Sequence, residues 1–145
     1  LGYLLGRSHY QMLFALRRLL ASHALDEPAF FILSTLSVRE PLGAAEIAAH
    51  VAYTAVSVSP ATLDALCARG LLQSSGAPDA PAYALTAGGR DAILHVLAAA
   101  KAMEADLVIR LGELESAALR NLLKRLILAT DPGLPKLWTA APPAA

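Results

Sequence analysis

Apolar residues recur every three or four positions over the first part of the chain, which is the spacing of amphipathic helices. Residues 1–24 form one such run, with charged and polar side chains spaced among the leucines. The segment Asp26-Glu27-Pro28 then supplies a capping carboxylate, an early negative charge and a proline suited to a first helical turn. The pattern predicts a long helix over residues 1–24 and a second helix over residues 28–38.

A short helix is predicted over residues 44–51, where Ile47 and Val51 lie one turn apart on the inner face and Leu42 packs beneath them. The position of Pro60 limits the helix that follows. If that helix began as early as Thr54, the proline would remove a backbone hydrogen bond and clash with the preceding turn. We therefore expect this helix to begin at residues 57–59.

The ends of this next helix are marked by local signals. Ser59 is suited to the cap, Pro60 to the first helical position, and Gly70 to a left-handed closing residue. A small β-hairpin should follow, with a strand starting at residues 71–73, a turn over residues 74–82 and a returning strand over residues 83–85. The inward-facing residues of the helix are then Leu63, Leu66 and Cys67.

Two more helices complete the pattern. Thr86 resembles the cap of a long helix to about Leu111, although the pair Gly88-Gly89 weakens its first turn. A leucine-rich helix is predicted over residues 113–129, where residues 131–133 end it, and residues 134–145 are expected to form a mobile tail. The predicted fold is mainly α with a small β-hairpin wing: a winged helix-turn-helix with helices before and after it.

Composition adds a second buried surface to this picture. A chain of 145 residues is most simply one folding unit. Its hydrophobic content of 56% and mean hydropathy of +0.49 nevertheless exceed the roughly 45–50% apolar content of an ordinary domain. Charged residues interrupt every stretch that approaches the roughly 18 apolar residues of a membrane span, so we expect no membrane contact. A subunit interface explains the high apolar content better than a membrane span does.

Charge and cysteine content restrict the classes of function further. Twelve basic and twelve acidic residues give zero formal charge, so nucleic-acid affinity would have to come from a local patch. The single cysteine, Cys67, excludes an internal disulfide and suits a reducing, cytoplasmic setting. The first residues lack the layout of a secretory signal. We interpret Cys67 as an inert core thiol rather than an oxidant sensor.

Several short motifs follow one another in a particular order and spacing: Leu36 in FFILSTL, Leu42-x3-Glu46-Ile47-Ala48, Leu66-x3-Gly70-Leu71-Leu72, Leu85-Thr86-x2-Gly89-Arg90, and Leu119-x2-Leu122-Leu123-x2-Leu126. With them the chain resembles, over nearly its whole length, the MarR family of bacterial transcription regulators. The resemblance implies a homodimer in which the first and last helices interlace. The segments would then be residues 1–38 for dimerisation and a ligand pocket, 39–90 for the winged helix-turn-helix, 91–130 for dimerisation and 131–145 for the tail.

The resemblance also implies binding to palindromic double-stranded DNA, with the helix at residues 59–68 in the major groove. Family members usually carry Asp-x-Arg in the wing, but here Pro81 stands two places after Asp79 and no arginine is present. No lysine or arginine lies between Arg39 and Arg69, or between Arg69 and Arg90. Candidate DNA contacts are therefore mostly hydroxyl groups: Ser57, Ser59, Thr62, Arg69, Ser75 and Arg90.

Two functions remain open from the sequence. The first is a ligand-responsive, dimeric repressor, and the second is a ligand-sensing or protein-interaction module whose DNA binding is weakened or lost. Arg17 and His23 are candidate contacts for a small aromatic or phenolic ligand, and the alternative for them is an interface salt bridge and a surface imidazole. We expect no enzyme, since no phosphate loop or nucleophile with its base is present. We also expect no cofactor and no metal site.

Overall fold

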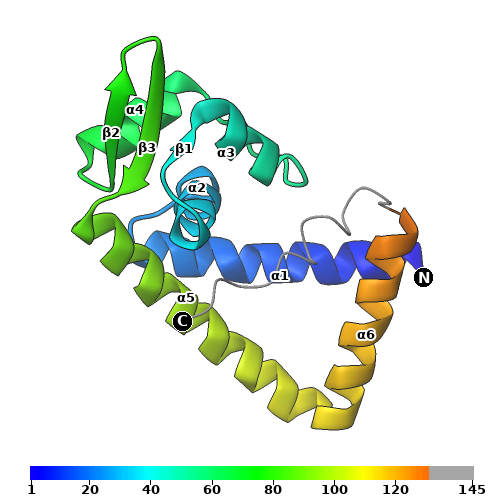
Figure 1. Cartoon of the computed structure of the whole chain (residues 1–145). Coiled ribbons are helices and arrows are strands. Elements are labelled where there is room, and N and C mark those ends of the chain that lie inside the picture. Colours follow the sequence, from blue (N-terminus) through cyan, green and yellow to red (C-terminus); the bar gives the residue numbers. More distant parts are fainter. Residues whose placement is uncertain (131–145) are drawn as a thin grey trace. The chain divides into compact units, whose positions relative to one another are not determined.

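The computed structural model describes residues 1–130, which form a mainly helical fold with one three-stranded antiparallel sheet (Figure 1). This confirms the predicted fold class. The predicted chain break at residues 131–133 and the tail lie outside the described residues. In chain order the elements are α1 (Gly2–Ser22), α2 (Glu27–Val38), β1 (Leu42–Gly43), α3 (Ala44–Val51), α4 (Pro60–Ala68), β2 (Leu72–Ala77), β3 (Ala80–Leu85), α5 (Ala87–Leu111) and α6 (Glu113–Thr130).

The chain divides into two compact units, Leu1–Lys101 and a second that begins at Ala102. The expectation of a single folding unit is therefore corrected. The physical reason is the length of α5, whose buried residues Gly89, Ile93 and Val96 all lie in its first half. The boundary falls within α5, and the second half of this helix contains no buried residue. The functional division of the chain into four segments remains a prediction.

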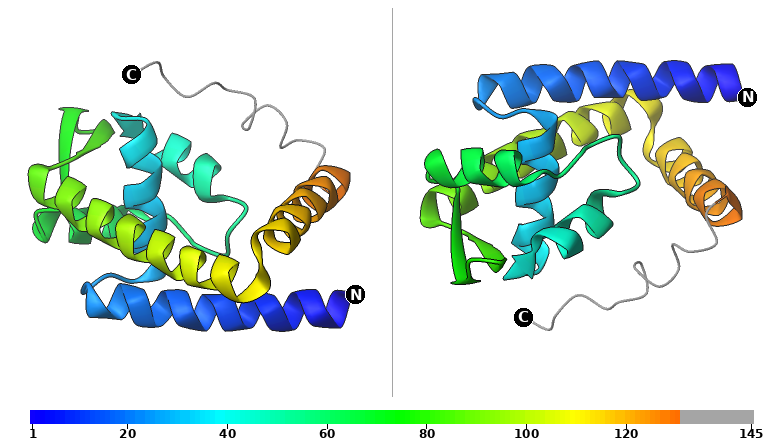
Figure 2. Two further views of the ribbon diagram at one scale, coloured as in Figure 1. Left: turned by 90° about the horizontal axis from the view of Figure 1, so that it is seen from below. Right: turned by 90° about the horizontal axis from the view of Figure 1, so that it is seen from above.

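Helix α2 forms the centre of the first unit. It contacts α1, α3, α4 and β3, and Figure 2 shows α3 and α4 both beside it. Ile32 and Leu33 on this helix have no exposed surface, and Leu36 is only 1% exposed. A helix that is contacted on several sides must be apolar around most of its circumference, as the sequence FFILSTL is. The other buried residues of the winged segment are Leu42, Ile47, Val51, Leu63, Leu66, Leu72, Tyr83 and Leu85.

Side-chain caps fix where the helices begin. The Asp26 carboxylate accepts a hydrogen bond from the Ala29 N–H at 2.9 Å, and Ser59 Oγ accepts one from the Thr62 N–H at 3.2 Å. Thr86 Oγ1 accepts a hydrogen bond from the Gly89 N–H at 3.0 Å. Each contact satisfies an N–H group that has no partner within its helix. All three predicted caps are confirmed, including the late start of α4 at Pro60.

Glycine is required at the end of α4 and at the start of α5 for two different reasons. Gly70 ends α4 with φ of +69°, a left-handed conformation that glycine adopts without steric cost. Gly89 lies in the first turn of α5 against the backbone of Leu71, where an added Cβ would stand 1.9 Å from the Leu71 carbonyl oxygen. The glycine that weakens this turn by propensity is therefore required by the close packing of α5 on the start of the wing.

The wing is longer than the sequence pattern indicated. The strands β2 and β3 pair along six residues each, from Leu72 opposite Leu85 to Ala77 opposite Ala80. The predicted turn over residues 74–82 was wrong, because only Pro78 and Asp79 form the turn. Cross-strand pairing outweighs the low strand propensity of serine, glycine and alanine.

A third strand was also missed by the sequence analysis. Leu42 and Gly43 form β1, which pairs with Tyr83 and Ala82 on the other side of β3. The pairing with β1 reaches only to Ala82, so Pro81 has no partner on that side of β3. The missing N–H group of the proline therefore costs no hydrogen bond there. The sheet order is therefore β1-β3-β2.

The second unit contains the last turns of α5 and the helix α6. Gly112 separates the two helices, and Arg120 of α6 donates to Glu104 of α5 at 3.3 Å. Ser116 is buried, whereas the leucines of α6 remain exposed in the described chain. In the described chain, α6 thus presents an apolar surface that no other element covers.

Candidate functional site

The outward face of α4 is small and nearly uncharged. Ala61, Asp64, Ala65 and Ala68 are all exposed, whereas Leu63 and Leu66 are buried. Leu63 and Leu66 face inward as the sequence predicted, whereas Cys67 is only half-buried. Arginine, lysine, asparagine and glutamine make the bidentate contacts to purine bases in a major groove, and none stands on this face.

The three hydroxyl candidates near the start of α4 do not lie in equivalent places. Ser57 is exposed and precedes the helix. Ser59 and Thr62 are half-buried, and their hydroxyl oxygens are hydrogen-bonded to each other at 2.8 Å while Ser59 also caps the helix. The side chains of Ser59 and Thr62 therefore serve the helix start first, and Ser57 is the more accessible donor.

The two arginine candidates are each held by another part of the first unit. Arg69 directs a guanidinium nitrogen to the Ala24 carbonyl oxygen at 2.5 Å, at the end of α1. Arg90 donates to Glu40 Oε1 at 2.6 Å. Glu40 was not singled out from the sequence. Its partners lie 45 and 50 residues away, so no local pattern could identify it.

The charge state of Glu40 follows from three contributions. Burial acts to raise the pKa of this carboxyl, but the hydrogen bond from the Leu85 N–H and the nearby Arg90 guanidinium outweigh it. The pKa of Glu40 therefore lies below its ordinary value of 4.5. These contacts stabilise the fold fully when the pH is above the ordinary pKa. Their contribution is lost as the pH falls through the lowered pKa.

The wing carries no positive charge. Residues 73–80 are exposed, Ser75 among them, and the ionised side chain in this stretch is Asp79 at the turn. The whole winged segment, residues 39–90, contains three basic against four acidic residues, a formal charge of −1. Those residues are Arg39, Arg69 and Arg90 against Glu40, Glu46, Asp64 and Asp79. The surface thus has the shape of a DNA reader with little of the charge that raises affinity for phosphate.

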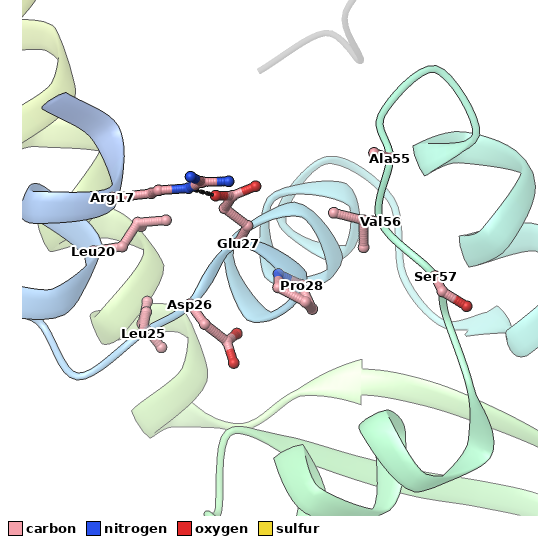
Figure 3. Close-up of a pocket in the computed structure, with 9 residues that line it drawn as sticks. All are labelled: Arg17, Leu20, Leu25, Asp26, Glu27, Pro28, Ala55, Val56 and Ser57. Atoms are coloured by element: carbon pink, nitrogen blue, oxygen red, sulfur yellow. Dashed lines mark hydrogen bonds and ion pairs between the residues drawn. The ribbon is translucent and has the colours of Figure 1, made fainter. Parts of the chain in front are cut away.

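An open pocket of about 640 Å³ lies between the end of α1, the start of α2 and the segment that leads into α4 (Figure 3). Arg17 and Glu27 reach toward one another on one side and form an ion pair, and residues 55–57 lie on the opposite side. Arg17 lines this pocket, whereas His23 is not among the lining residues, and a ligand-binding role for either residue remains a prediction. The complete lining is Arg17, Leu20, Leu25, Asp26, Glu27, Pro28, Ala55, Val56 and Ser57.

The charges of this pocket are partly compensated. Glu27 neutralises Arg17, and the Asp26 carboxylate accepts the hydrogen bond that caps α2. Leucine, proline, alanine and valine side chains supply most of the remaining wall. The pocket therefore offers apolar surface with one arginine, and a ligand carboxylate would have to compete with Glu27 for that arginine.

Other reactive groups do not gather into a site. Burial raises the pKa of the Cys67 thiol, and the negative charge of Asp64 raises it further, which disfavours the reactive thiolate. Among residues 1–130, no three histidine, cysteine or carboxylate side chains lie close enough together to hold a metal ion. None of the described helices combines the length and the apolar character needed to cross a membrane.

Comparison with known proteins relates this architecture to solved structures. No family model matches the sequence, and no curated protein matches it either. A MarR family protein of Mycobacterium tuberculosis, Rv2887, solved in complex with DNA, is 28% identical with a TM-score of 0.70, over 87% of this chain and 96% of that one. The transcriptional repressor CouR, bound to a 23-mer DNA duplex, is 26% identical with a TM-score of 0.73, over 87% of this chain and 91% of that one.

A third solved structure has the same architecture. It is a probable transcriptional regulator from Pseudomonas aeruginosa, 26% identical with a TM-score of 0.67, over 88% of this chain and 96% of that one. These similarities extend over nearly the full length of each protein. They therefore include the helices on either side of the winged segment as well as the segment itself.

Proposed function

We propose that this chain, which has the winged-helix fold of the MarR family of transcription regulators, is itself a DNA-binding transcription regulator that acts as a homodimer. The observation that carries the proposal is the exposed α4, held between its Ser59 cap and Gly70, in a chain similar to two DNA-bound proteins over nearly its whole length. In such an arrangement α4 enters the major groove and the wing reaches the neighbouring minor groove. Ser57, Arg69, Ser75 and Arg90 then supply the accessible polar contacts.

The exposed leucines of α6 support the dimer. Leu122 is 58% exposed and Leu114 is 83% exposed in the described chain. An exposed apolar surface of this kind is typical of a protein–protein interface. A two-fold axis would place two copies of α4 on successive half-sites of a palindromic duplex.

A small ligand in the pocket beside Arg17 is proposed to release the DNA and so make the protein a ligand-responsive repressor. Residues 55–57 line this pocket and lead directly into the cap of α4, so an occupant of the pocket touches the segment that positions the recognition helix. A neutral phenolic or aromatic molecule suits the site better than a carboxylate, because Glu27 already pairs with Arg17. His23 would contribute only from outside the pocket lining.

The surface of α4 favours a second function on the same scaffold. Alanines and Asp64 occupy its outward face, and the nearest two arginines are hydrogen-bonded to Glu40 and to the Ala24 carbonyl. Such a surface fits a ligand-sensing or protein-interaction module whose DNA binding is weakened or lost. The two functions differ in one measurable property, which is affinity for duplex DNA at low salt.

Titration of a fluorescent random-sequence duplex with the purified chain tests the proposal. Counterion release makes nonspecific binding strongest at low ionic strength, so we expect association below about 100 mM sodium chloride and its loss as salt rises. The slope of affinity against salt then counts the phosphates contacted. No association at low salt would favour the second function.

A further inference from the structure

Glu40 forms one of the longest-range polar contacts of the first unit. One carboxylate oxygen accepts a hydrogen bond from the Leu85 N–H at 2.6 Å, and the other accepts one from Arg90 at the same distance. Leu85 is the last residue of β3, and Arg90 lies in the first turns of α5. A single side chain after α2 therefore holds both sides of the junction between the wing and α5.

The two contacts of Glu40 differ in exposure. The Leu85 N–H belongs to a residue that is 2% exposed, so this bond is protected from solvent. The Arg90 side chain is 50% exposed and the Glu40 side chain 23%, so the ion pair reaches the surface. Pairs of this kind contribute little to stability, because water screens them. The arginine can thus leave Glu40 at small cost while the wing stays in place.

The same guanidinium is a candidate phosphate contact. Arg90 follows the wing directly and is one of three basic residues between residues 39 and 90. A guanidinium bound to a carboxylate has its charge compensated and fewer free N–H groups for a phosphate. In a segment with a formal charge of −1, the loss of one cation weighs heavily on attraction to DNA.

We propose that Glu40 competes with the DNA backbone for Arg90 and thereby lowers the affinity of the winged segment for duplex. The inference rests on the proposed DNA-binding function and adds a residue that sets its strength. Arg90 exchanges between the Glu40 carboxylate and a phosphate, and Glu40 keeps its bond to the Leu85 N–H in both states. The weak charge of this surface is then partly a consequence of internal pairing and not only of composition.

The substitution Glu40→Gln tests the competition. The glutamine carbonyl can still accept the Leu85 N–H, but it offers no negative charge to Arg90. We expect duplex binding to tighten by about threefold per protomer at low salt, and the slope of log affinity against log salt to steepen by about 0.9 per protomer, as for one additional phosphate contact. A thermal melt of both chains checks that the fold is retained.

Two control variants separate this mechanism from a general change of charge. Asp91→Asn removes the same charge next to Arg90, from an exposed residue whose side chain makes no hydrogen bond among the described residues. We expect a smaller gain in affinity and an unchanged slope. In an Arg90→Gln background, Glu40→Gln should give no more than the small gain of Asp91→Asn and no change of slope, because the contested cation is gone. A carboxyl NMR titration should also show a higher pKa for Glu40 in the Arg90→Gln chain.

The outcomes distinguish this inference from the proposed function. Three results would each overturn the competition alone: binding by the natural chain with no gain in Glu40→Gln, a gain of the same size and slope in the Arg90→Gln background, or a pKa of Glu40 that is the same with and without Arg90. Absence of duplex binding by both the natural chain and Glu40→Gln at low salt would overturn the proposed function and the competition with it. A gain with the steeper slope, lost in the Arg90→Gln background, establishes the competition.

Discussion

The winged segment buries its large apolar residues, whereas the helices α1 and α6 on either side of it leave many of theirs exposed. Within residues 39–90, eight large apolar residues are at most 5% exposed, and Tyr53 is the one large hydrophobic side chain that is strongly exposed. Its ring still packs edge to face with Phe31 at a centroid distance of 6.2 Å. Helices α1 and α6 instead leave many large side chains exposed: Tyr3, Leu4, Tyr10, Met12, Phe14, Leu114, Leu119, Leu122, Leu123, Leu126, Ile127 and Leu128.

This difference locates the hydrophobic excess of the chain. The large apolar residues of the winged segment are buried in a core that they share with α2, and the surface of the segment is made of small and polar side chains. The excess lies in α1 and α6, where no burial within the described chain uses it. A folded protein rarely keeps so large an apolar surface in water. Under the proposed function, recognition would therefore fall to the middle of the chain and self-association to its two outer parts.

The largest expected effect is the loss of the dimer in Leu122→Glu. If α6 is an interface, each dimer of this variant must bury two unpaired charges, at a cost of at least several kcal/mol. We expect the mass in sedimentation to fall from twice 15.1 kDa to 15.1 kDa at micromolar concentration. Asn121→Glu adds the same charge to the neighbouring exposed residue and should leave the dimer largely intact.

Two results would break the assignment of self-association to the outer helices. The first is a natural chain that sediments at 15.1 kDa at every concentration. The second is a Leu122→Glu chain that remains a dimer, because the leucine would then lie outside the interface. Leu63→Ala provides the contrast, since its side chain has no exposed surface. It should lower the free energy of unfolding by about 2–5 kcal/mol without changing the mass.

Local signals in the sequence were sufficient for most of the winged segment. Asp26, Ser59 and Thr86 each cap a helix as predicted, and Pro60 fixed the start of α4 because proline restricts the residues immediately before it. Gly70 closed the same helix with the predicted positive φ. These features depend on neighbours within four residues, so a single sequence contains their cause.

Features that depend on distant partners could not be predicted in this way. The strand β1 has only two residues and exists because β3 lies beside it. The wing strands extend through small residues because each one has a cross-strand partner. Glu40 and the anchoring of Arg69 on Ala24 connect positions 45 or more residues apart. For the candidate site, the outward face of α4 was predictable, whereas the engagement of its arginines was not.

A smaller effect is expected at the junction between the wing and α5, where Gly88 and Gly89 form a matched pair. In Gly89→Ala the new Cβ would stand 1.9 Å from the Leu71 carbonyl oxygen, so the backbone must shift at a cost of about 1–3 kcal/mol. In Gly88→Ala the nearest atom is the Gly70 carbonyl oxygen at 3.5 Å, an ordinary contact, and alanine favours the helix by up to about 1 kcal/mol. Chemical denaturation measures both.

The two substitutions should therefore change the free energy of unfolding in opposite directions. Equal effects would mean that α5 does not pack on Leu71 as closely as the structure places it. The two variants also probe the connection between the winged segment and α5, which are joined by backbone packing. If Gly89→Ala lowers stability without altering the mass in sedimentation, the core of the winged segment and self-association are independent.

The smallest effect concerns the wing itself, whose lack of charge separates this segment from a strong DNA reader. Pro81→Arg places an arginine two residues after Asp79, restoring the Asp-x-Arg spacing, and supplies an N–H group where β3 has no partner from β1. One added phosphate or minor-groove contact should raise affinity by about threefold per protomer and steepen the salt slope by about 0.9. Pro81→Gln removes the proline without adding charge and should leave the slope unchanged. An unchanged slope in Pro81→Arg would mean that the wing never approaches DNA, so that recognition, if it occurs, depends on α4 and Arg90 alone.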